Sequence, residues 1–385
     1  MLERVFTGSE KYYKLLMSLL AVVAVGFGCY LYQLTHGLTV TGMSRDVSWG
    51  LYIAQFTFLV GVAASAVMVV LPYYLHHYKT FGRITILGEF LAVSAVTMCL
   101  LFIIVDLGQP QRALNVLLHP PPNSVLFWDM IVLNGYLFIN IIVGWNVLAA
   151  ERKGVMVQSW VKPLIYLSIP WAVSIHTVTA FLYAGLPGRH SWLTAILAAR
   201  FLASAFAAGP SLLILLCLFL RKHTKFDAGK EAIQKLATIV TYAMLISIFF
   251  VLLEVFTAFY SNIPGHMHGL KYIFFGLEGH ARLTPWMWAA TVMAFGAAFI
   301  LLNPGMRENE MTLKIACTCV FLSLWIEKGI IFVISGFVPT PTEHVVEYYP
   351  SIPELCIVVG VWALGFFILS LLYKIAISIK EELAA

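Results

Sequence analysis

Seven ionisable residues stand in, or at the ends of, segments that are otherwise apolar enough to cross a lipid bilayer. They are Asp106, Asp129, His176, Arg200, Glu254, Glu327 and Lys328. An ionised group in hydrocarbon costs roughly 2.5–3.5 kcal/mol on membrane-insertion scales, so such residues persist where they pair or work. Carboxylates and imidazoles exchange protons, and guanidinium groups donate hydrogen bonds to polar atoms. These residues therefore predict a polar membrane interior that handles protons and a lipid-soluble substrate.

The composition excludes an ordinary soluble domain. Hydrophobic residues make up 61% of the 385 residues, charged residues only 11%, and the mean hydropathy is +0.88. Soluble domains carry about 25% charged residues. The basic residues are scattered over short loops, which is not a nucleic-acid-binding pattern, and the alternation of a membrane β-barrel is missing. We expect residues 1–385 to form one all-α polytopic domain in the lipid bilayer.

Ten apolar segments reach the length of roughly 20 residues that a transmembrane helix needs. They cover residues 12–34, 50–78, 83–106, 124–150, 162–184, 192–220, 237–260, 285–303, 313–335 and 353–373. The first segment is too long for a signal-peptide core, so we expect it to be retained as a span.

The basic residues predict the orientation of these spans. The termini and alternate loops carry 17 of the 24 Lys and Arg residues, whereas the other loops carry five. Because basic loops face the cytoplasm, both termini are expected there. Asp129, His176, Arg200 and Glu254 then lie at similar depths in the outer half of the bilayer. One buried histidine alone is more often structural, but four such residues that converge would favour a site.

Two further groups have more than one interpretation. The segment Asp106-Leu-Gly-Gln-Pro-Gln-Arg112 ends the third span, where Gly and Pro break the helix. Its carboxylate and guanidinium either form an ion pair that fixes a loop, or Asp106 accepts protons with Arg112 adjusting its proton affinity. Glu327 and Lys328 point about 100° apart on a helix, so we expect each to pair with another span. Together with Glu89 they are candidates for an inward proton path.

Several cofactors are not expected in this chain. The six cysteines lie in apolar stretches without a CxxC pair, so neither a metal site nor an iron–sulfur cluster is predicted. Transmembrane haem b needs two axial ligands at matched depth, and only His176 is well inside a span. No phosphate-binding or dinucleotide motif is present.

The chain resembles the NrfD/PsrC family of quinone-interacting membrane subunits. The resemblance rests on Trp49-Gly50-Leu51-Tyr52, on the small residues Gly61, Ala63 and Ala64, and on the Asp106–Arg112 segment. It covers essentially the whole chain and is greatest to the DsrP-like members of sulfur-metabolising prokaryotes. The resemblance implies two four-helix bundles, spans two to five and six to nine, with flanking helices. It also implies a prokaryotic cytoplasmic membrane, no haem or cluster in this subunit, and an outer iron–sulfur ferredoxin-like partner.

The expected function is oxidation of menaquinol or reduction of menaquinone near the outer face, within a respiratory complex that also holds cytochrome and cytoplasmic subunits. His176 is expected to bond a quinone oxygen, and Arg200 to stabilise negative charge on it. Asp106 and Asp129 are expected to exchange the second proton with the outer phase. The residues expected to contact the quinone are Trp49, Tyr52, Arg112 and Glu254. The alternatives are a secondary transporter or proton-conducting protein, and a passive anchor for other subunits.

Overall fold

The computed structural model describes residues 2–76 and 78–384, and this part of the chain contains ten segments able to span a membrane. They are α1 (Glu10–His36), α2 with α3 (Leu51–Ala64 and Val67–Tyr74), α4 (Thr85–Asp106), α6 (Val125–Lys153), α7 (Val161–Ala184), α8 (Leu197–His223), α9 (Lys230–Ser261), α11 (Thr284–Leu302), α13–η6–α14 (Glu310–Leu324, Trp325–Ile331 and Phe332–Ser335) and α15 (Ile352–Ala384). Each overlaps one predicted span, although α15 continues beyond the predicted end at residue 373 and α9 begins before residue 237. The prediction of ten spans is confirmed. The chain is a multi-pass integral membrane protein.

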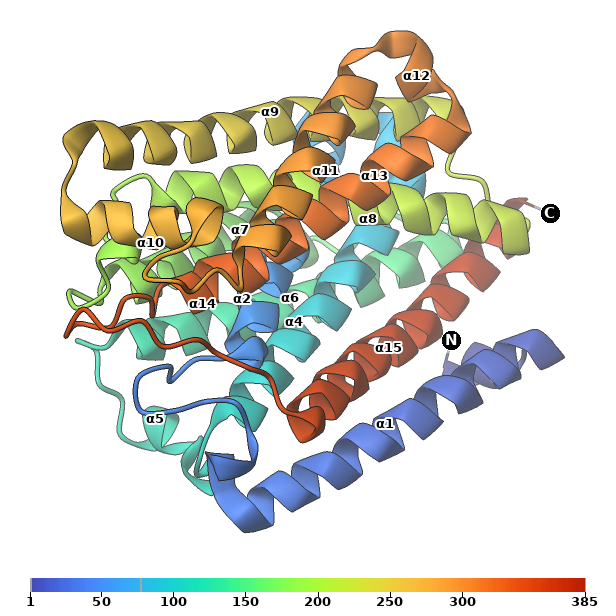
Figure 1. The fold of residues 1–385 in the computed structure, drawn as a ribbon. Coiled ribbons are helices and arrows are strands. Elements are labelled where there is room, and N and C mark those ends of the chain that lie inside the picture. The colour runs from blue at the N-terminus through green and yellow to red at the C-terminus, as the bar shows by residue number, and fades with distance from the viewer. Residues whose placement is uncertain (1, 77, 385) are drawn as a thin grey trace.

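Short helices connect these spans. They are η1 (Leu2–Phe6), η2 (Gly37–Val40), η3 (Lys79–Arg83), η4 (Pro110–Arg112), α5 (Asn115–Leu118), η5 (His190–Trp192), α10 (Pro264–Phe275) and α12 (Pro304–Glu308). Among them α10 has only 12 residues and cannot reach across a bilayer. It begins at a proline in the first turn, a position that proline favours, and folds back alongside α9 (Figure 1).

The spans form two four-helix bundles, as the family resemblance implied. In the first bundle α2 packs on α4, α4 on α6, α6 on α7, and α7 returns to α2. In the second, α8 packs on α9 and α13, while α11 packs on α9 and α13. The bundles meet where α2 contacts α8 and η6, and where α7 contacts α8. Residues on α2, η6 and α7 therefore face both bundles, and this junction carries much of the buried polar chemistry.

The helices α1 and α15 form a flanking pair outside both bundles (Figure 1). They approach most closely at Gly26 and Gly360, where a methyl group added to Gly26 would lie 2.7 Å from the Gly360 Cα. Small residues allow such close contact between membrane helices. Only two residues of α1, Gly26 and Gln33, are buried. The bundles therefore hold α1 mainly through α15, which itself packs along α4.

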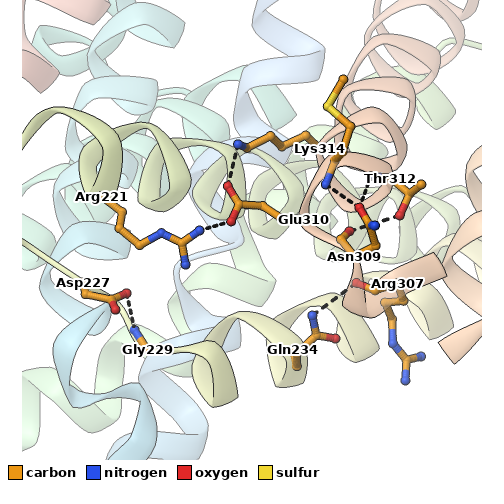
Figure 2. Close-up of polar contacts among 10 residues, drawn as sticks. Arg221, Asp227, Gly229, Gln234, Arg307, Asn309, Glu310, Thr312 and Lys314 are labelled. Carbon is orange, nitrogen blue, oxygen red and sulfur yellow. Dashed lines mark hydrogen bonds and ion pairs between the residues drawn. The ribbon is translucent and has the colours of Figure 1, made fainter. Parts of the chain in front are cut away.

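Both termini and several basic loops lie at one end of the molecule, which we call the basic end. Arg4 pairs with Glu382 across the termini, and Lys380 Nζ lies 3.2 Å from Glu151 Oε2. Figure 2 shows the same end of the second bundle, where Glu310 pairs with both Arg221 and Lys314. The Asn309 side chain caps α13 by accepting from two backbone N–H groups. The assignment of this end to the cytoplasm stays a prediction.

Candidate functional site

The site is centred on Arg200 of α8, which pairs with two carboxylates from different helices. Its Nη1 pairs with Oε2 of Glu254 on α9, and its Nη2 with Oε1 of Glu327 on η6. These three side chains are only 12–16% exposed. The second carboxylate oxygen of Glu254 is buried without a hydrogen-bond partner among the described residues. Such an oxygen can accept a proton or a hydrogen bond from a ligand.

This trio lines a cavity of about 490 Å³ at the end of the molecule opposite the basic end. We call it the Arg200 cavity. Its walls come from α8, α9, η5, α10 and α14, and its polar lining also includes Thr257, Ser261 and His266. Ligand pockets commonly measure about 300–1,000 Å³ and combine apolar walls with a few polar groups. The Arg200 cavity has this character.

An apolar groove of about 430 Å³ between α9, α11 and α13 adjoins the Arg200 cavity. Both hollows are lined by Val251, Met287 and Glu327. The outer parts of the groove are exposed, since Phe275 is 68% and Phe295 50% accessible on the membrane-facing surface. We call it the lipid-facing groove. A molecule with an apolar tail can lie in the groove and reach the carboxylate of Glu327 with its polar head.

Glu327 and Lys328 stand on η6, a π-helical stretch between α13 and α14. Such stretches are rare and occur frequently at functional sites. A π-helical stretch has more residues per turn than an α-helix, so its side chains point in different directions from those of the flanking α-helices. Here Glu327 meets Arg200 on one side, while Lys328 meets residues of α7 and α8 on the other. The prediction that each would pair with other spans is confirmed.

Lys328 connects the ion-pair trio to the first bundle. Its Nζ lies 3.3 Å from Nε2 of His176 on α7 and donates to the Phe201 carbonyl at 3.2 Å. It also lies 4.5 Å from the centroid of the Phe201 ring, a favourable position for a cation. His176 is fully buried, and its Nδ1 has no partner among the described residues. An ammonium at Lys328 donates to Nε2, so a neutral His176 carries its proton on Nδ1.

A glycine makes room for Lys328. A methyl group at Gly61 on α2 would lie 3.1 Å from the Lys328 Nζ, close enough to displace it. The same helix approaches η6 at Gly329, where a methyl group would lie 3.0 Å from the Ala54 carbonyl oxygen. The small-residue face that identified the family resemblance therefore has a physical reason. It admits a buried ammonium group between the two bundles.

Asp129 lies near His176 along the chain of polar contacts in the first bundle. It is almost fully buried on α6, and Thr179 of α7 donates to its Oδ1 at 2.7 Å. Thr179 and His176 are three residues apart on α7, so they share one helix face. On α2, the Thr57 hydroxyl is hydrogen-bonded to the Tyr183 hydroxyl. The ring centroids of Tyr183 and Trp49 lie 5.5 Å apart. These contacts continue the polar interior towards the end opposite the basic end.

The pairing considered for Asp106 and Arg112 is not formed. Arg112 belongs to the short helix η4, where its side chain is exposed, and no ion pair joins the two among the described residues. Asp106 Oδ1 is buried and has no hydrogen-bond partner in the described part of the chain. The sequence spacing permitted the contact, but η4 turns the guanidinium outwards. Tyr52 nearby donates to Gln33 at 2.6 Å, and Gln33 in turn donates to the Val105 carbonyl.

The eleven predicted site residues therefore fall into groups that the sequence did not distinguish. The structure joins Arg200 to Glu254 and Glu327, and joins Lys328 to His176, by direct contacts. Glu327 and Lys328, which the sequence grouped with Glu89 as candidates for an inward proton path, contact Arg200 and His176 respectively. Other predicted residues lie outside the Arg200 cavity: Asp106, Asp129, Trp49, Tyr52, Arg112 and Glu89. Their functional roles stay predictions.

Glu89 is a separate feature of the first bundle. It is buried on α4, and both of its carboxylate oxygens lack partners among the described residues. Gly144 on α6 faces it, since a methyl group there would lie 3.3 Å from Glu89 Oε2. A carboxyl group that makes no hydrogen bond in a protein interior is costly in its charged form. Its position is compatible with a proton-carrying role on the side of the basic end.

Sequence reasoning missed several buried polar residues, among them Glu354 and Gln55. Glu354 at the start of α15 is fully buried and accepts hydrogen bonds from the backbone of Gly42 and Leu51. The run Ser351-Ile-Pro-Glu354 forms a reciprocal capping box, a signal that could have been read from the sequence. Gln55, fully buried on α2, was also missed. A single amide in an apolar run gives no comparable signal.

The fold and site together define a helical membrane protein in which a lipid-accessible cavity meets buried ion pairs. The sequence model of the family described as "Polysulphide reductase, NrfD" matches residues 39–373, and the chain belongs to this family. Within residues 2–76 and 78–384, no group of three or more His, Cys, Asp or Glu side chains gathers in a metal-binding arrangement.

Three relatives are similar over nearly the whole chain. A putative membrane subunit of dimethyl sulfoxide reductase from Halobacterium salinarum is 25% identical, over 90% of this chain and 87% of its own length. The Hdr-like menaquinol oxidoreductase integral membrane subunit of Archaeoglobus fulgidus is 23% identical, over 97% and 95%. The menaquinone reductase integral membrane subunit of Nitratidesulfovibrio vulgaris is 22% identical, over 93% and 90%.

Proposed function

We propose that this protein is the quinone-interacting membrane subunit of a respiratory electron-transfer complex, and that menaquinol or menaquinone reacts at the Arg200 cavity. The observation that carries the proposal is the shared wall between an apolar, lipid-facing groove and a cavity with buried ion pairs. Two relatives have names that contain menaquinol or menaquinone, which supports this substrate class. The positive-inside rule favours the outer half of the membrane for this cavity.

The groove and the cavity have complementary tasks in this proposal. The isoprenoid tail lies in the lipid-facing groove, and the ring reaches the trio of Arg200, Glu254 and Glu327. Arg200 stabilises the negative charge that develops on a ring oxygen during proton and electron transfer. The free oxygen of Glu254 accepts a proton from the quinol, or returns it in the reverse reaction.

The polar contacts behind the trio provide a second route for protons. His176 does not line the Arg200 cavity and reaches it only through Lys328, the sequence neighbour of Glu327. We therefore assign His176 to proton exchange behind the cavity rather than to direct contact with the quinone ring. Asp129 follows at the next turn of α7 through Thr179. Asp106 is proposed to act nearer the outer surface.

Electrons must leave or enter through other subunits. The similar proteins are named as membrane subunits of reductases and oxidoreductases, which supports a multi-subunit complex. We propose an iron–sulfur ferredoxin-like partner at the outer face beside the Arg200 cavity, with cytochrome and cytoplasmic subunits as the remaining members of the complex. The DsrP-like resemblance favours sulfur or sulfite metabolism as its setting.

Proton conduction or secondary transport is the second candidate function. It is favoured by one observation, the unpartnered Glu89 on the side of the basic end together with the Lys328–His176 contact. A chain of such groups from one end to the other would carry protons without a redox reaction. Proton flux into liposomes by the purified chain alone, without quinone, would support this alternative.

Quinone titration tests the proposal. Quenching of intrinsic fluorescence by menaquinone-4 is measured on the purified protein in detergent, beside the variant Glu254→Gln and the matched variant Glu89→Gln. We expect binding by the wild type and Glu89→Gln, and weaker binding by Glu254→Gln, since Glu254 lines the Arg200 cavity and Glu89 does not. Equal binding by all three would contradict the assignment of the site. The absence of binding both here and in the whole complex would contradict the quinone function.

A further inference from the structure

A second large cavity lies on the other side of the second bundle, between that bundle and α15. It has a volume of about 610 Å³ and is floored by α2 at Leu51 and Gln55. Trp325 of η6 and Trp362 of α15 line it from either side. We call it the Gln55 cavity. It shares no lining residue with the Arg200 cavity.

The side chain of Gln55 presents an unused donor in this cavity. Its Oε1 accepts from the Trp325 indole at 2.8 Å and from the Trp362 indole at 2.9 Å. Because an indole N–H can only donate, the amide oxygen must face both rings, and this fixes the amide orientation. The Nε2 is left buried without a partner among the described residues. An unsatisfied buried donor costs about 1–3 kcal/mol, which an acceptor atom of a ligand would recover.

The mouth of the Gln55 cavity opens towards lipid. Leu355 and Val359 of α15 line it and are 44% and 55% exposed, while Gln55 at the floor is 0% exposed. Trp286 at the rim is half exposed, a common position for tryptophan at a membrane interface. Gln55 is four residues from the start of α2, or about 6 Å along the helix axis. The unused donor therefore lies just inside the membrane end rather than at mid-bilayer.

A cationic side chain lies at the rim of the Gln55 cavity, at the same membrane end as Gln55. Arg282 lines the cavity, and its guanidinium carbon lies 3.5 Å from the Tyr349 ring centroid. In the described part of the chain Arg282 forms no ion pair with a carboxylate. The nearby Glu347 pairs with His280. An exposed arginine at this level suits a phosphate group, to which guanidinium donates two hydrogen bonds.

The lining of the Gln55 cavity is unsuited to proton-coupled chemistry. Among the described residues that line it there is neither a carboxylate nor a histidine. Its single phenol, Tyr348, donates to Glu354, and burial together with the Glu354 carboxylate raises the pKa of Tyr348 above its ordinary value. A quinone bound here would find no group with which to exchange protons. The occupant is therefore a molecule that binds without reacting.

We infer that the Gln55 cavity holds a phospholipid whose ester carbonyl accepts from Gln55 Nε2 and whose phosphate meets Arg282. One acyl chain lies against the exposed residues of α15. The lipid joins α2, η6 and α15, and so helps to hold the flanking pair of α15 and α1 on the bundles. This inference is independent of the proposed quinone reaction, because the two cavities share no residue.

Native mass spectrometry of the purified chain measures bound lipid directly. After extensive detergent washing, the protein is incubated with palmitoyl-oleoyl phosphatidylglycerol, palmitoyl-oleoyl phosphatidylethanolamine or menaquinone-4. Three variants test the three parts of the site: Val359→Trp fills the mouth, Arg282→Ala removes the cation, and Gln55→Met removes the amide donor. Leu252→Trp, in the lipid-facing groove, is the matched control for bulk at a lipid-exposed position.

We expect one phospholipid on the wild type and on Leu252→Trp, and about tenfold less on the Gln55 and Arg282 variants, since each loses a hydrogen bond to the lipid. Val359→Trp should bind at least about tenfold less, because its indole fills the mouth of the cavity. Val359 and Arg282 are exposed, so these two variants keep the fold, which a thermal melt verifies. Three results would overturn the inference. They are no bound phospholipid on the wild type, unchanged binding in all three variants, or menaquinone-4 bound in place of phospholipid and expelled by Val359→Trp.

Discussion

The Arg200 cavity and the Gln55 cavity are similar in size and both reach the lipid, yet only the first is lined by carboxylates and a histidine. The first contains one arginine, two carboxylates and a histidine, whereas the second contains an amide, a phenol and an arginine at its rim. Titratable groups make proton exchange possible in the first, while the second can only hold a ligand. Access from the membrane therefore does not by itself make a cavity a reaction site. The titratable side chains that line the cavity do.

Arg200→Gln should have the largest effect. It leaves Glu254 and Glu327 buried without their shared cation, and removing one partner of a buried ion pair costs about 3–5 kcal/mol. We expect a lower melting temperature in detergent and loss of quinol-linked electron transfer in the complex. Replacing all three residues with glutamine should restore much of the stability but not the activity. Full activity in the well-folded triple variant would remove the basis for distinguishing the two cavities.

Breaking the contact between Lys328 and His176, behind the Arg200 cavity, should have the next largest effect. His176→Ala and Lys328→Met each break the link between the two bundles, and we expect electron transfer to fall at least about tenfold, within the range of general acid–base contributions. Gly61→Ala should produce a milder loss, because its methyl group displaces the Lys328 ammonium without removing it. Steady-state quinol oxidation by the assembled complex measures all three. Normal rates in assembled His176→Ala would show that protons take another route.

Glu89→Gln should separate proton movement from quinone binding. Both carboxylate oxygens lack hydrogen-bond partners among the described residues, so the amide replaces the carboxyl group with little loss of packing. We expect unchanged menaquinone-4 affinity and a severalfold slower proton uptake, measured with a pH indicator in proteoliposomes that contain the complex. Weakened quinone affinity with unaltered proton uptake would be the opposite of this expectation.

Trp325→Phe should have the smallest effect. It removes one of the two indole donors to Gln55 at a cost of about 1 kcal/mol, and Trp325 is not among the residues that line the Arg200 cavity. A slightly lower melting temperature and unchanged electron transfer are expected from calorimetry and from the activity of the complex. A large loss of electron transfer would assign the Gln55 cavity to the reaction.

The spans could be predicted from sequence because burial in lipid imposes a length and composition on every helix. The ten segments and the charged residues within them are local properties of the chain. Which of those residues meet is not local. Arg200 pairs with residues 54 and 127 positions away, and the packing of two bundles determines those contacts. The family resemblance supplied the bundles, but it did not supply the pairing.

Three features of the structure had no sequence signal. The π-helical stretch at Glu327 depends on hydrogen bonds that the residue pattern does not encode. The exposure of Arg112 depends on the direction of a short helix after Pro110, which breaks the predicted turn back to Asp106. The unused donor of Gln55 exists only because two tryptophans from distant helices both donate to its oxygen. These are consequences of tertiary packing, and they include both the candidate site and the inferred lipid site.

Photolabelling with an azido-menaquinone analogue tests the central claim most directly, because it reports which cavity receives the quinone ring. The complex is irradiated with the bound analogue, and the labelled peptides are located by mass spectrometry. Labelling is predicted in α9 and α10, around the Arg200 cavity, and it should decrease when unlabelled menaquinone competes. Competed labelling in the first half of α2 and in α15, around Gln55, would contradict the account.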